Sequence, residues 1–152
     1  MPRIRAGRDR HTEPAIAIDV VGRAAPLSHR SVREAAARVI RGERARAVLS
    51  FTFVGRDRMR ALNARWKGSR RSTDVLAFSL PAPDGVLAGD VYICPWTASR
   101  EARRRGIPLR EELVRLVVHG TLHALGWEHP DDERRERSAM WKRQERHVRA
   151  LV

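Results

Sequence analysis

The sequence predicts a single α+β domain in which about four strands combine with about five helices. Short runs rich in β-branched and aromatic residues indicate the strands, and longer segments with apolar residues at helical spacing indicate the helices. No repeat or linker divides the chain, and its 152 residues match the usual size of one domain with its own core. We therefore expect one hydrophobic core rather than separate folding units.

The N-terminal part of the domain is expected to begin with a strand, a helix and a second strand. Residues 15–21 and 45–54 are dense in β-branched and aromatic side chains, which favour extended structure. Between them, Ser28 or Ser31 can cap a helix whose apolar residues recur at helical spacing and which ends at Gly42.

The middle of the chain contains a short helix and two further strands. Apolar residues on one side of residues 57–66 indicate the helix, and residues 67–72 form a polar loop after it. Residues 73–80 and 86–94 have the pattern of strands, and the prolines, aspartate and glycine in 81–85 are typical of a turn between them. These strands complete the expected sheet.

The C-terminal part is expected to be helical. Residues 97–105 form a helix that ends at Gly106, and Pro108 takes a first-turn position in the next helix, over 109–125, where its missing N–H costs nothing. A final helix from Asp131 to about residue 151 has acids in its first turn and arginines later, as the helix dipole prefers. The residues of the long helix that we expect in the core are Leu113, Leu116, Val117 and Leu122.

The chain is strongly basic, with a formal net charge of +13, and all its basic residues except Lys67 and Lys142 are arginines. Arginine binds phosphate through its planar guanidinium, and a positive field attracts polyanions, so nucleic acid is the expected partner. The alternative is that a GC-rich genome places arginine wherever a basic residue is tolerated and that many of these side chains only solvate helix faces. We expect residues 1–13 to form a basic flexible N-terminal arm before the domain at 14–152.

The sequence contains no signal for a membrane or for secretion. It lacks an apolar run of the length that a spanning helix needs, and it lacks a basic start followed by an apolar stretch. Cys94 is the only cysteine, which rules out an intramolecular disulfide framework, and we expect it to be a small buried hydrophobe. We therefore expect a soluble cytoplasmic protein that does not engage a membrane.

Half of the six histidines lie in the segment 119–129, which reads HGTLHALGWEH. His119 and His123 are four residues apart on the expected helix, so their rings lie roughly 6 Å apart along the axis and about 40° apart around it. Gly126 can end the helix and turn the chain back, which brings His129 to the same point. These three residues form a candidate ligand set for one metal ion on a zincin-like helix.

Three protein ligands with a fourth position open to water are typical of catalytic zinc, whereas structural zinc usually has four protein ligands. The spacing H-x-x-x-H-x-x-G-x-x-H matches that of metzincin peptidases, but Gly120 replaces their general-base glutamate. A zinc peptidase is therefore a disfavoured alternative.

Three further segments accompany the histidine segment, namely residues 62–67 (LNARWK), 73–78 (TDVLAF) and 89–91 (GDV). With these four segments in this order, the chain resembles the YbeY family of metal-dependent endoribonucleases over roughly residues 15–150. The histidine segment is highly specific, whereas the other three are persuasive only together.

The resemblance implies a single domain with a mixed sheet packed by helices and one zinc ion held by His119, His123 and His129 in a cleft. It also implies cleavage of single-stranded ribosomal RNA, including maturation of the 16S rRNA 3′ end, and ribosome quality control, with the ribosome or its small subunit as partner. Two residues depart from the family pattern. Lys67 stands where an arginine implicated in activity is usual, and Glu128 stands where aspartate is common. Lysine keeps the charge but loses the bidentate guanidinium.

Our hypothesis for the mechanism is metal-assisted hydrolysis or transesterification of an RNA phosphodiester. Lys67 and His119 are the residues that we assign to catalysis, with Lys67 holding a phosphate oxygen. Since Gly120 cannot act as a base, either zinc hydroxide or the RNA 2′-hydroxyl attacks phosphorus. Asp74 and Asp90 can line the cleft, but aspartates at strand starts or tight turns more often cap backbone N–H groups, so both stay outside the catalytic set.

Two alternatives stay open. Trp66 and Trp127 can stack nucleobases, but at helical spacing or beside a glycine a tryptophan more often belongs to the core. The chain can also be a non-catalytic ribosome-assembly factor whose metal only stabilises the fold, because its charge and its family resemblance would be the same. The sequence does not indicate the oligomeric state.

Overall fold

The computed structural model of the protein describes residues 16–68, 73–80 and 83–152. The arm expected over residues 1–13 and most of the loop expected over 67–72 lie outside these ranges.

The strands are β1 (Ile16–Val21), β2 (Ala47–Phe53), β3 (Val75–Leu80) and β4 (Leu87–Ile93). The α-helices are α1 (His29–Gly42), α2 (Arg56–Lys67), α3 (Pro95–Arg105), α4 (Leu109–Ala124) and α5 (Ala139–Leu151). Short 3-10 turns occur at η1 (Pro83–Gly85) and η2 (Arg135–Arg137). The α+β class is confirmed.

The strands form one mixed sheet in the order β1-β2-β4-β3. The β1–β2 and β2–β4 pairs are parallel, and Phe51 of β2 lies opposite Val91 of β4. The β3–β4 pair is antiparallel, because the short connection through η1 reverses the chain after β3 and places β4 beside it. The mixed sheet therefore agrees with the expectation drawn from the family resemblance.

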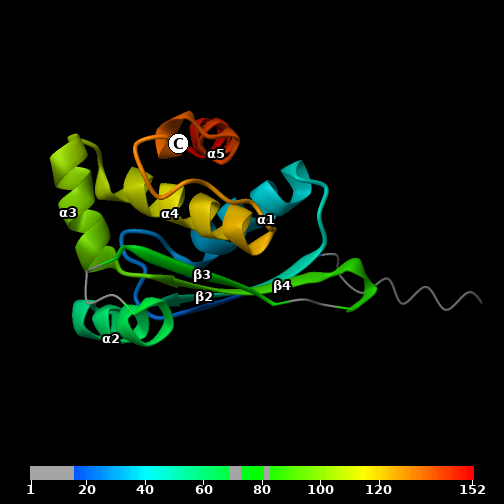
Figure 1. Cartoon of the computed structure of the whole chain (residues 1–152), viewed down its shortest axis with the longest axis horizontal. Helices are drawn as coiled ribbons and strands as arrows, with labels where there is room; N and C mark the ends of the chain where they lie inside the picture. Colours follow the sequence, from blue (N-terminus) through cyan, green and yellow to red (C-terminus); the bar gives the residue numbers. More distant parts are fainter. Residues whose placement is uncertain (1–15, 69–72, 81–82) are drawn as a thin grey trace, which may run out of the picture.

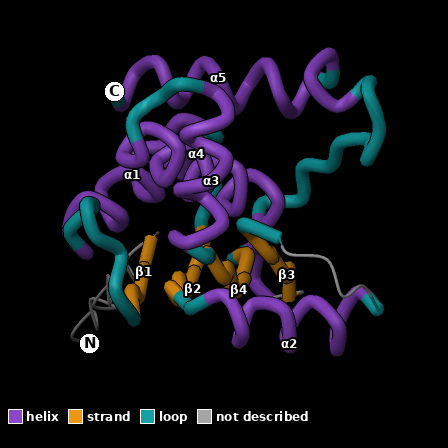
Figure 2. Tube along the Cα trace, turned by 90° about the vertical axis from the view of Figure 1, so that its left-hand side faces the viewer, coloured by secondary structure: helices purple, strands orange, loops and turns teal. Residues whose placement is uncertain are grey.

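The helices cover the two faces of the sheet unequally (Figures 1 and 2). Helices α1, α3, α4 and α5 lie on one side, whereas α2 lies on the other. Helix α4 is the central element of the thick layer, since it contacts α1, α3, α5 and the strands β3 and β4. None of the described helices is both long enough and apolar enough to cross a membrane.

Helix α4 is buried on nearly all sides, as expected for a helix whose apolar residues surround its axis. The four residues expected in the core are all buried, namely Leu113, Leu116, Val117 and Leu122. They belong to the main core together with apolar residues of α1, β2 and β4. The same helix carries His119 and His123, so the core itself holds the metal-binding candidates in place.

Gly120 lets α4 approach the sheet closely. A Cβ atom at this position would overlap Cγ1 of Val91 on β4, so any side chain here requires the helix or the strand to move. Position 120 therefore faces the sheet and not the cavity beside the histidines. This packing gives a physical reason why no glutamate follows His119.

The start of the final helix differs from the sequence-based expectation. The final helix begins at Ala139 and not at Asp131, and its first turn contains no acid, so that prediction was wrong. The Asp132 carboxylate accepts hydrogen bonds from the backbone N–H and the guanidinium of Arg134, and this local turn competes with helix formation. Ser138 then caps α5 by accepting a hydrogen bond from the Trp141 backbone N–H at 3.2 Å.

Prolines mark the starts of α3 and α4. Pro95 takes the first helical position of α3, two residues before the predicted start. Pro108 is the N-cap of α4 rather than a residue of its first turn. The alternative left open for α1 is resolved in favour of Ser28, whose side chain accepts from the Ser31 N–H.

We expect Gly120→Ala to lower the free energy of unfolding by about 1–3 kcal/mol, the usual cost of overpacking a core. In a Val91→Ala background the overlapping methyl groups are gone, so the same change should raise the stability by about 1 kcal/mol through helix propensity. Denaturant unfolding of the four proteins in the presence of chelator measures this double-mutant cycle. An equal effect of Gly120→Ala in both backgrounds would contradict the proposed packing.

Candidate metal centre

The three histidines of segment 119–129 converge on one point. His119 and His123 project from the last turns of α4, and His129 approaches from the loop that follows. One ligand atom of each residue lies within 4.8 Å of the others, and the ring centroids are 4.6 to 5.1 Å apart. His119 is buried, with 5% of its surface exposed. The expected clustering is therefore present in the structure.

A tight turn after α4 brings His129 back to the helix. Gly126 has a φ of +100°, a left-handed conformation that glycine adopts without strain. The Trp127 N–H donates to the Leu122 carbonyl at 3.0 Å, and the Gly126 N–H donates to the His123 carbonyl at 2.9 Å. These bonds satisfy carbonyls of the last turn and reverse the chain, as the glycine position predicts.

Each histidine ring uses Nδ1 to donate a hydrogen bond to an oxygen atom. The acceptors are Gln144 Oε1 for His119 at 2.6 Å, the Trp127 carbonyl for His123 at 2.9 Å and the Pro130 carbonyl for His129 at 2.8 Å. With Nδ1 protonated, Nε2 of each ring keeps a free lone pair. Oxygen partners of this kind fix the tautomer and ring orientation of metal-binding histidines.

The ring geometry fits a metal ion. His123 Nε2 and His129 Nε2 are 3.1 Å apart, and in this tautomer two lone pairs face each other, which is favourable only with a cation or a proton between them. Burial, followed by the charge of His123, lowers the pKa of His119 to about 3. Burial also lowers the pKa of His123, with His129 as the next cause. Neutral imidazoles in a group of three suit zinc and similar ions.

A cavity of about 440 Å³ opens onto the three rings. Its wall also contains Lys67 from the end of α2, Asp74 immediately before β3, Glu128, and Arg135 from η2. Lys67 therefore lines the same cavity as the three histidines. Asp90 does not line this cavity, and its carboxylate instead accepts a hydrogen bond from Ser50 Oγ at 2.6 Å.

Asp74 lines the cavity, one of the two places considered for it from the sequence, whereas Arg135 is a cavity residue that the sequence did not single out. Burial raises the pKa of Asp74, and its backbone carbonyl accepts a hydrogen bond from the Cys94 N–H at 2.9 Å. Gln144 was also missed, because it comes from α5 and nothing in the sequence links it to His119.

Two contacts from other elements hold the end of α4. Ser79 Oγ on β3 donates to the carbonyls of His123 and Ala124, at 3.0 and 3.2 Å. Gln144, which is buried on α5, holds the ring of His119. The site therefore depends on the sheet below α4 and on the helix above it.

The two tryptophans considered as base-stacking candidates occupy different environments. Trp66 is 58% exposed at the end of α2, so the expectation that it belongs to the core was wrong. Its ring makes an edge-to-face contact with Phe78 at 5.6 Å. Trp127 is partly buried and packs against the main core, as expected. Cys94 is buried, in agreement with its expected role as a small hydrophobe.

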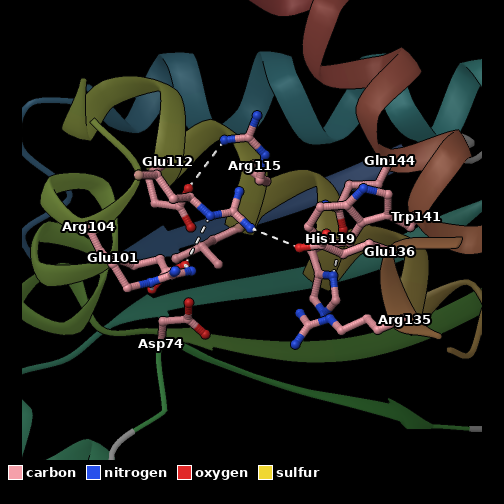
Figure 3. Close-up of a pocket in the computed structure, with 12 residues that line it drawn as sticks. Asp74, Glu101, Arg104, Glu112, Arg115, His119, Arg135, Glu136, Trp141 and Gln144 are labelled. Carbon is pink, nitrogen blue, oxygen red and sulfur yellow. Dashed lines mark hydrogen bonds and ion pairs between the residues drawn. The ribbon is translucent and has the colours of Figure 1, made fainter. Parts of the chain in front are cut away.

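A second cavity of about 280 Å³ adjoins the histidines and shares Asp74, His119 and Arg135 with the first (Figure 3). Ion pairs cross its wall, where Arg105 binds Glu101 at 3.0 Å and Arg115 binds Glu112 at 3.2 Å. Burial raises the pKa of the Glu112 carboxyl. The first pair lies within α3 and the second within α4, and Arg115 also binds Glu145 of α5 at 3.0 Å.

The fold and the site together define an α+β protein with a three-histidine candidate metal centre at the end of a buried helix. The family model described as "Endoribonuclease YbeY" matches residues 23–152. The chain belongs to the YbeY family.

Individual relatives agree with this assignment. A protein named Endoribonuclease YbeY from Anaeromyxobacter sp. is 47% identical over 96 residues, which cover 60% of this chain and 50% of the relative. A protein of the same name from Stenotrophomonas maltophilia is 34% identical over 113 residues, 70% of each chain. The solution structure of TM1509 from Thermotoga maritima is similar, with a TM-score of 0.63, 26% identity and 88% coverage of both chains. For some curated relatives the match spans only half to three-fifths of their length, 50% and 59% in two cases.

We expect Gln144→Leu to weaken metal binding about 10- to 100-fold, because the Nδ1–H of His119 loses its acceptor and the ring loses its orientation. Gln144→Glu keeps an acceptor oxygen at the same position and should bind the metal at least as tightly as the original protein. Competition with a chromophoric chelator measures both affinities. Equal affinities of the Leu and Glu variants would show that Gln144 does not orient His119.

Proposed function

We propose that this protein is a zinc-dependent endoribonuclease that cleaves single-stranded RNA. We further propose that it acts in ribosomal RNA maturation, including the 16S rRNA 3′ end, and in ribosome quality control in the cytoplasm. The observation that carries this proposal is the cavity in which three convergent imidazoles lie beside Lys67. Membership of the YbeY family supports it, because the curated relatives are named endoribonucleases.

His119, His123 and His129 are the proposed ligands of one zinc ion. When bound, zinc would supply a Lewis acid for water or for a phosphoryl oxygen. The oxygen partners of the three Nδ1 atoms keep the Nε2 atoms aimed at this position. We assign His119 to catalysis through this role, and Lys67 to holding a phosphate oxygen on the same cavity wall.

Two routes of phosphodiester cleavage fit these residues. If water attacks phosphorus, a P–O bond to water forms, the P–O3′ bond breaks and the leaving oxygen takes a proton, which gives a 5′-phosphate and a 3′-hydroxyl. If the 2′-hydroxyl attacks, the P–O5′ bond breaks, which gives a 2′,3′-cyclic phosphate and a 5′-hydroxyl. Analysis of the product ends distinguishes the two routes.

A preference for single strands is supported by the exposed ring of Trp66. This residue directly precedes Lys67 on α2, so the exposed indole and the cavity lysine belong to the same helix end. Stacking on an aromatic side chain contributes about 1–3 kcal/mol per base and requires an unpaired base. The net charge of +13 adds an attraction for the RNA backbone that does not depend on sequence.

The two alternative functions are less well supported by the geometry. A peptidase of the metzincin type needs a glutamate at position 120, where a side chain would overlap Val91. A purely structural metal is usually enclosed by four protein ligands, whereas the described residues bring together three histidines at an open cavity. We retain the proposed division into a basic arm at 1–13 and the endoribonuclease domain at 14–152.

We expect zinc-loaded protein to cleave single-stranded RNA, a chelator to stop the reaction and added zinc to restore it. His129→Ala removes one ligand without altering α4, so zinc content and cleavage should fall together. The loss should exceed the roughly 100-fold effect of replacing only a hydrogen-bond partner of a ligand. His29→Ala, on α1, is the matched control and should change neither. Metal analysis and a labelled-RNA assay provide the measurements. Cleavage that resists chelator would contradict zinc dependence, and unchanged rRNA processing in cells carrying His129→Ala would favour the assembly-factor alternative.

Lys67→Met should lower kcat/KM for RNA cleavage by about 10- to 100-fold, the range of one hydrogen bond to a charged group. Lys67→Arg should retain most of the activity, because it keeps the charge and adds a bidentate donor. The control is Lys142→Met, which makes the same change at the only other lysine, exposed on α5. Equal activities of Lys67→Met and Lys142→Met would exclude a phosphate contact at Lys67.

A further inference from the structure

Arg135 is a cation of the site that, in the described part of the chain, has a buried donor atom without an acceptor. Its Nε atom is buried and has no hydrogen-bond partner among the described residues. Within the same part of the chain, Arg135 forms no ion pair with a carboxylate, whereas Arg104, Arg105 and Arg115 on the neighbouring wall all do. A buried donor on a permanently charged group requires an acceptor, which points to a ligand.

The position of Arg135 is set by its surroundings and not by a flexible loop. Its backbone N–H donates to the Asp132 carbonyl at 3.0 Å, and its own carbonyl accepts from Ser138 Oγ at 2.6 Å. Its guanidinium lies over the Trp141 ring, 5.8 Å from the centroid. Figure 3 shows the guanidinium beside His119 and across from Asp74. The side chain is therefore held where the two cavities meet.

The chemistry around Arg135 suits an anion that also touches the histidine centre. Arg135 and Lys67 line the same cavity as the three rings, and both carry a positive charge. A guanidinium binds two oxygens of a phosphate in one plane, whereas an ammonium binds as a point charge. The site thus contains the planar donor that Lys67 cannot provide.

We propose that Arg135 binds the non-bridging oxygens of an RNA phosphate seated beside the three-histidine centre. This inference rests on the proposed endoribonuclease function and names one further residue that contacts its substrate. Arg135 then supplies the bidentate contact, and Lys67 adds a second charge from another wall of the cavity. The Trp141 ring keeps the guanidinium in place by a cation–π contact when the phosphate is absent.

The test compares Arg135→Met with Arg137→Met, which removes the same charge from an exposed residue of the same 3-10 turn that lines neither cavity. The first probe is a 2′-O-methylated single-stranded oligonucleotide bound to zinc-loaded protein, with affinity measured across salt concentrations. For Arg135→Met we expect at least tenfold weaker binding and a salt slope reduced by about 0.7, the value for one phosphate contact. Arg137→Met should leave both close to those of the unmodified protein, and Arg135→Lys should give intermediate affinity with an unchanged slope.

Cleavage and metal content separate this inference from the proposed function. Chelator-sensitive cleavage with identical salt slopes for Arg135→Met and Arg137→Met would overturn the role of Arg135 and leave the function intact. Absence of cleavage together with an Arg135-dependent salt slope would refute the function but support the anion site. A lower melting temperature and lower zinc content of Arg135→Met with an unchanged slope would show a purely structural role and overturn the inference.

Discussion

The close contact between Gly120 and Val91 is the constraint on which the site depends. It sets α4 directly on β4, so that the helix face bearing Leu113, Val117 and Gly120 lies against other core elements. Because residues four apart share a helix face, His119 and His123 must then point together toward the open end of the layer. A bulkier residue at 120 would lift the helix away from the sheet and displace both rings. The missing glutamate is therefore a consequence of packing that also determines the chemistry available.

The oxygen partners of the imidazoles extend this constraint beyond α4. His119 is oriented by a side chain of α5, while His123 and His129 are oriented by backbone carbonyls of their own loop. The centre thus joins a buried helix, a turn and the C-terminal helix. A ligand that binds the folded arrangement and not the unfolded chain stabilises all three. The stability of the fold and the affinity for a ligand are therefore coupled through the contact of Gln144 on α5 with His119.

The parts of the structure that could be predicted from the sequence depend on local patterns. Strand and helix positions followed residue periodicity, and the histidine cluster followed from spacing within eleven residues and a glycine turn. The start of α5 could not be predicted from acid placement, because the Asp132–Arg134 turn competes with the helix. Asp74 was considered only as a possible cleft residue, and Arg135 and Gln144 come from elements whose place beside the histidines no periodicity records. Trp66 lies on an otherwise polar helix end, where spacing alone does not distinguish burial from exposure.

Under the proposed function, the distribution of charge accounts for how a very basic chain selects one phosphate. On the wall formed by α3 and α4, Arg105 pairs with Glu101 within α3 and Arg115 pairs with Glu112 within α4, so the charge of each arginine is balanced by a carboxylate of its own helix. The remaining cations of the metal cavity, Lys67 and Arg135, form no ion pair with the described carboxylates. The long-range field of the other exposed arginines raises the local concentration of any polyanion. Among the described residues, Lys67 and Arg135 are the cations that line the cavity of the imidazoles, and the proposed selection of a single phosphate depends on them.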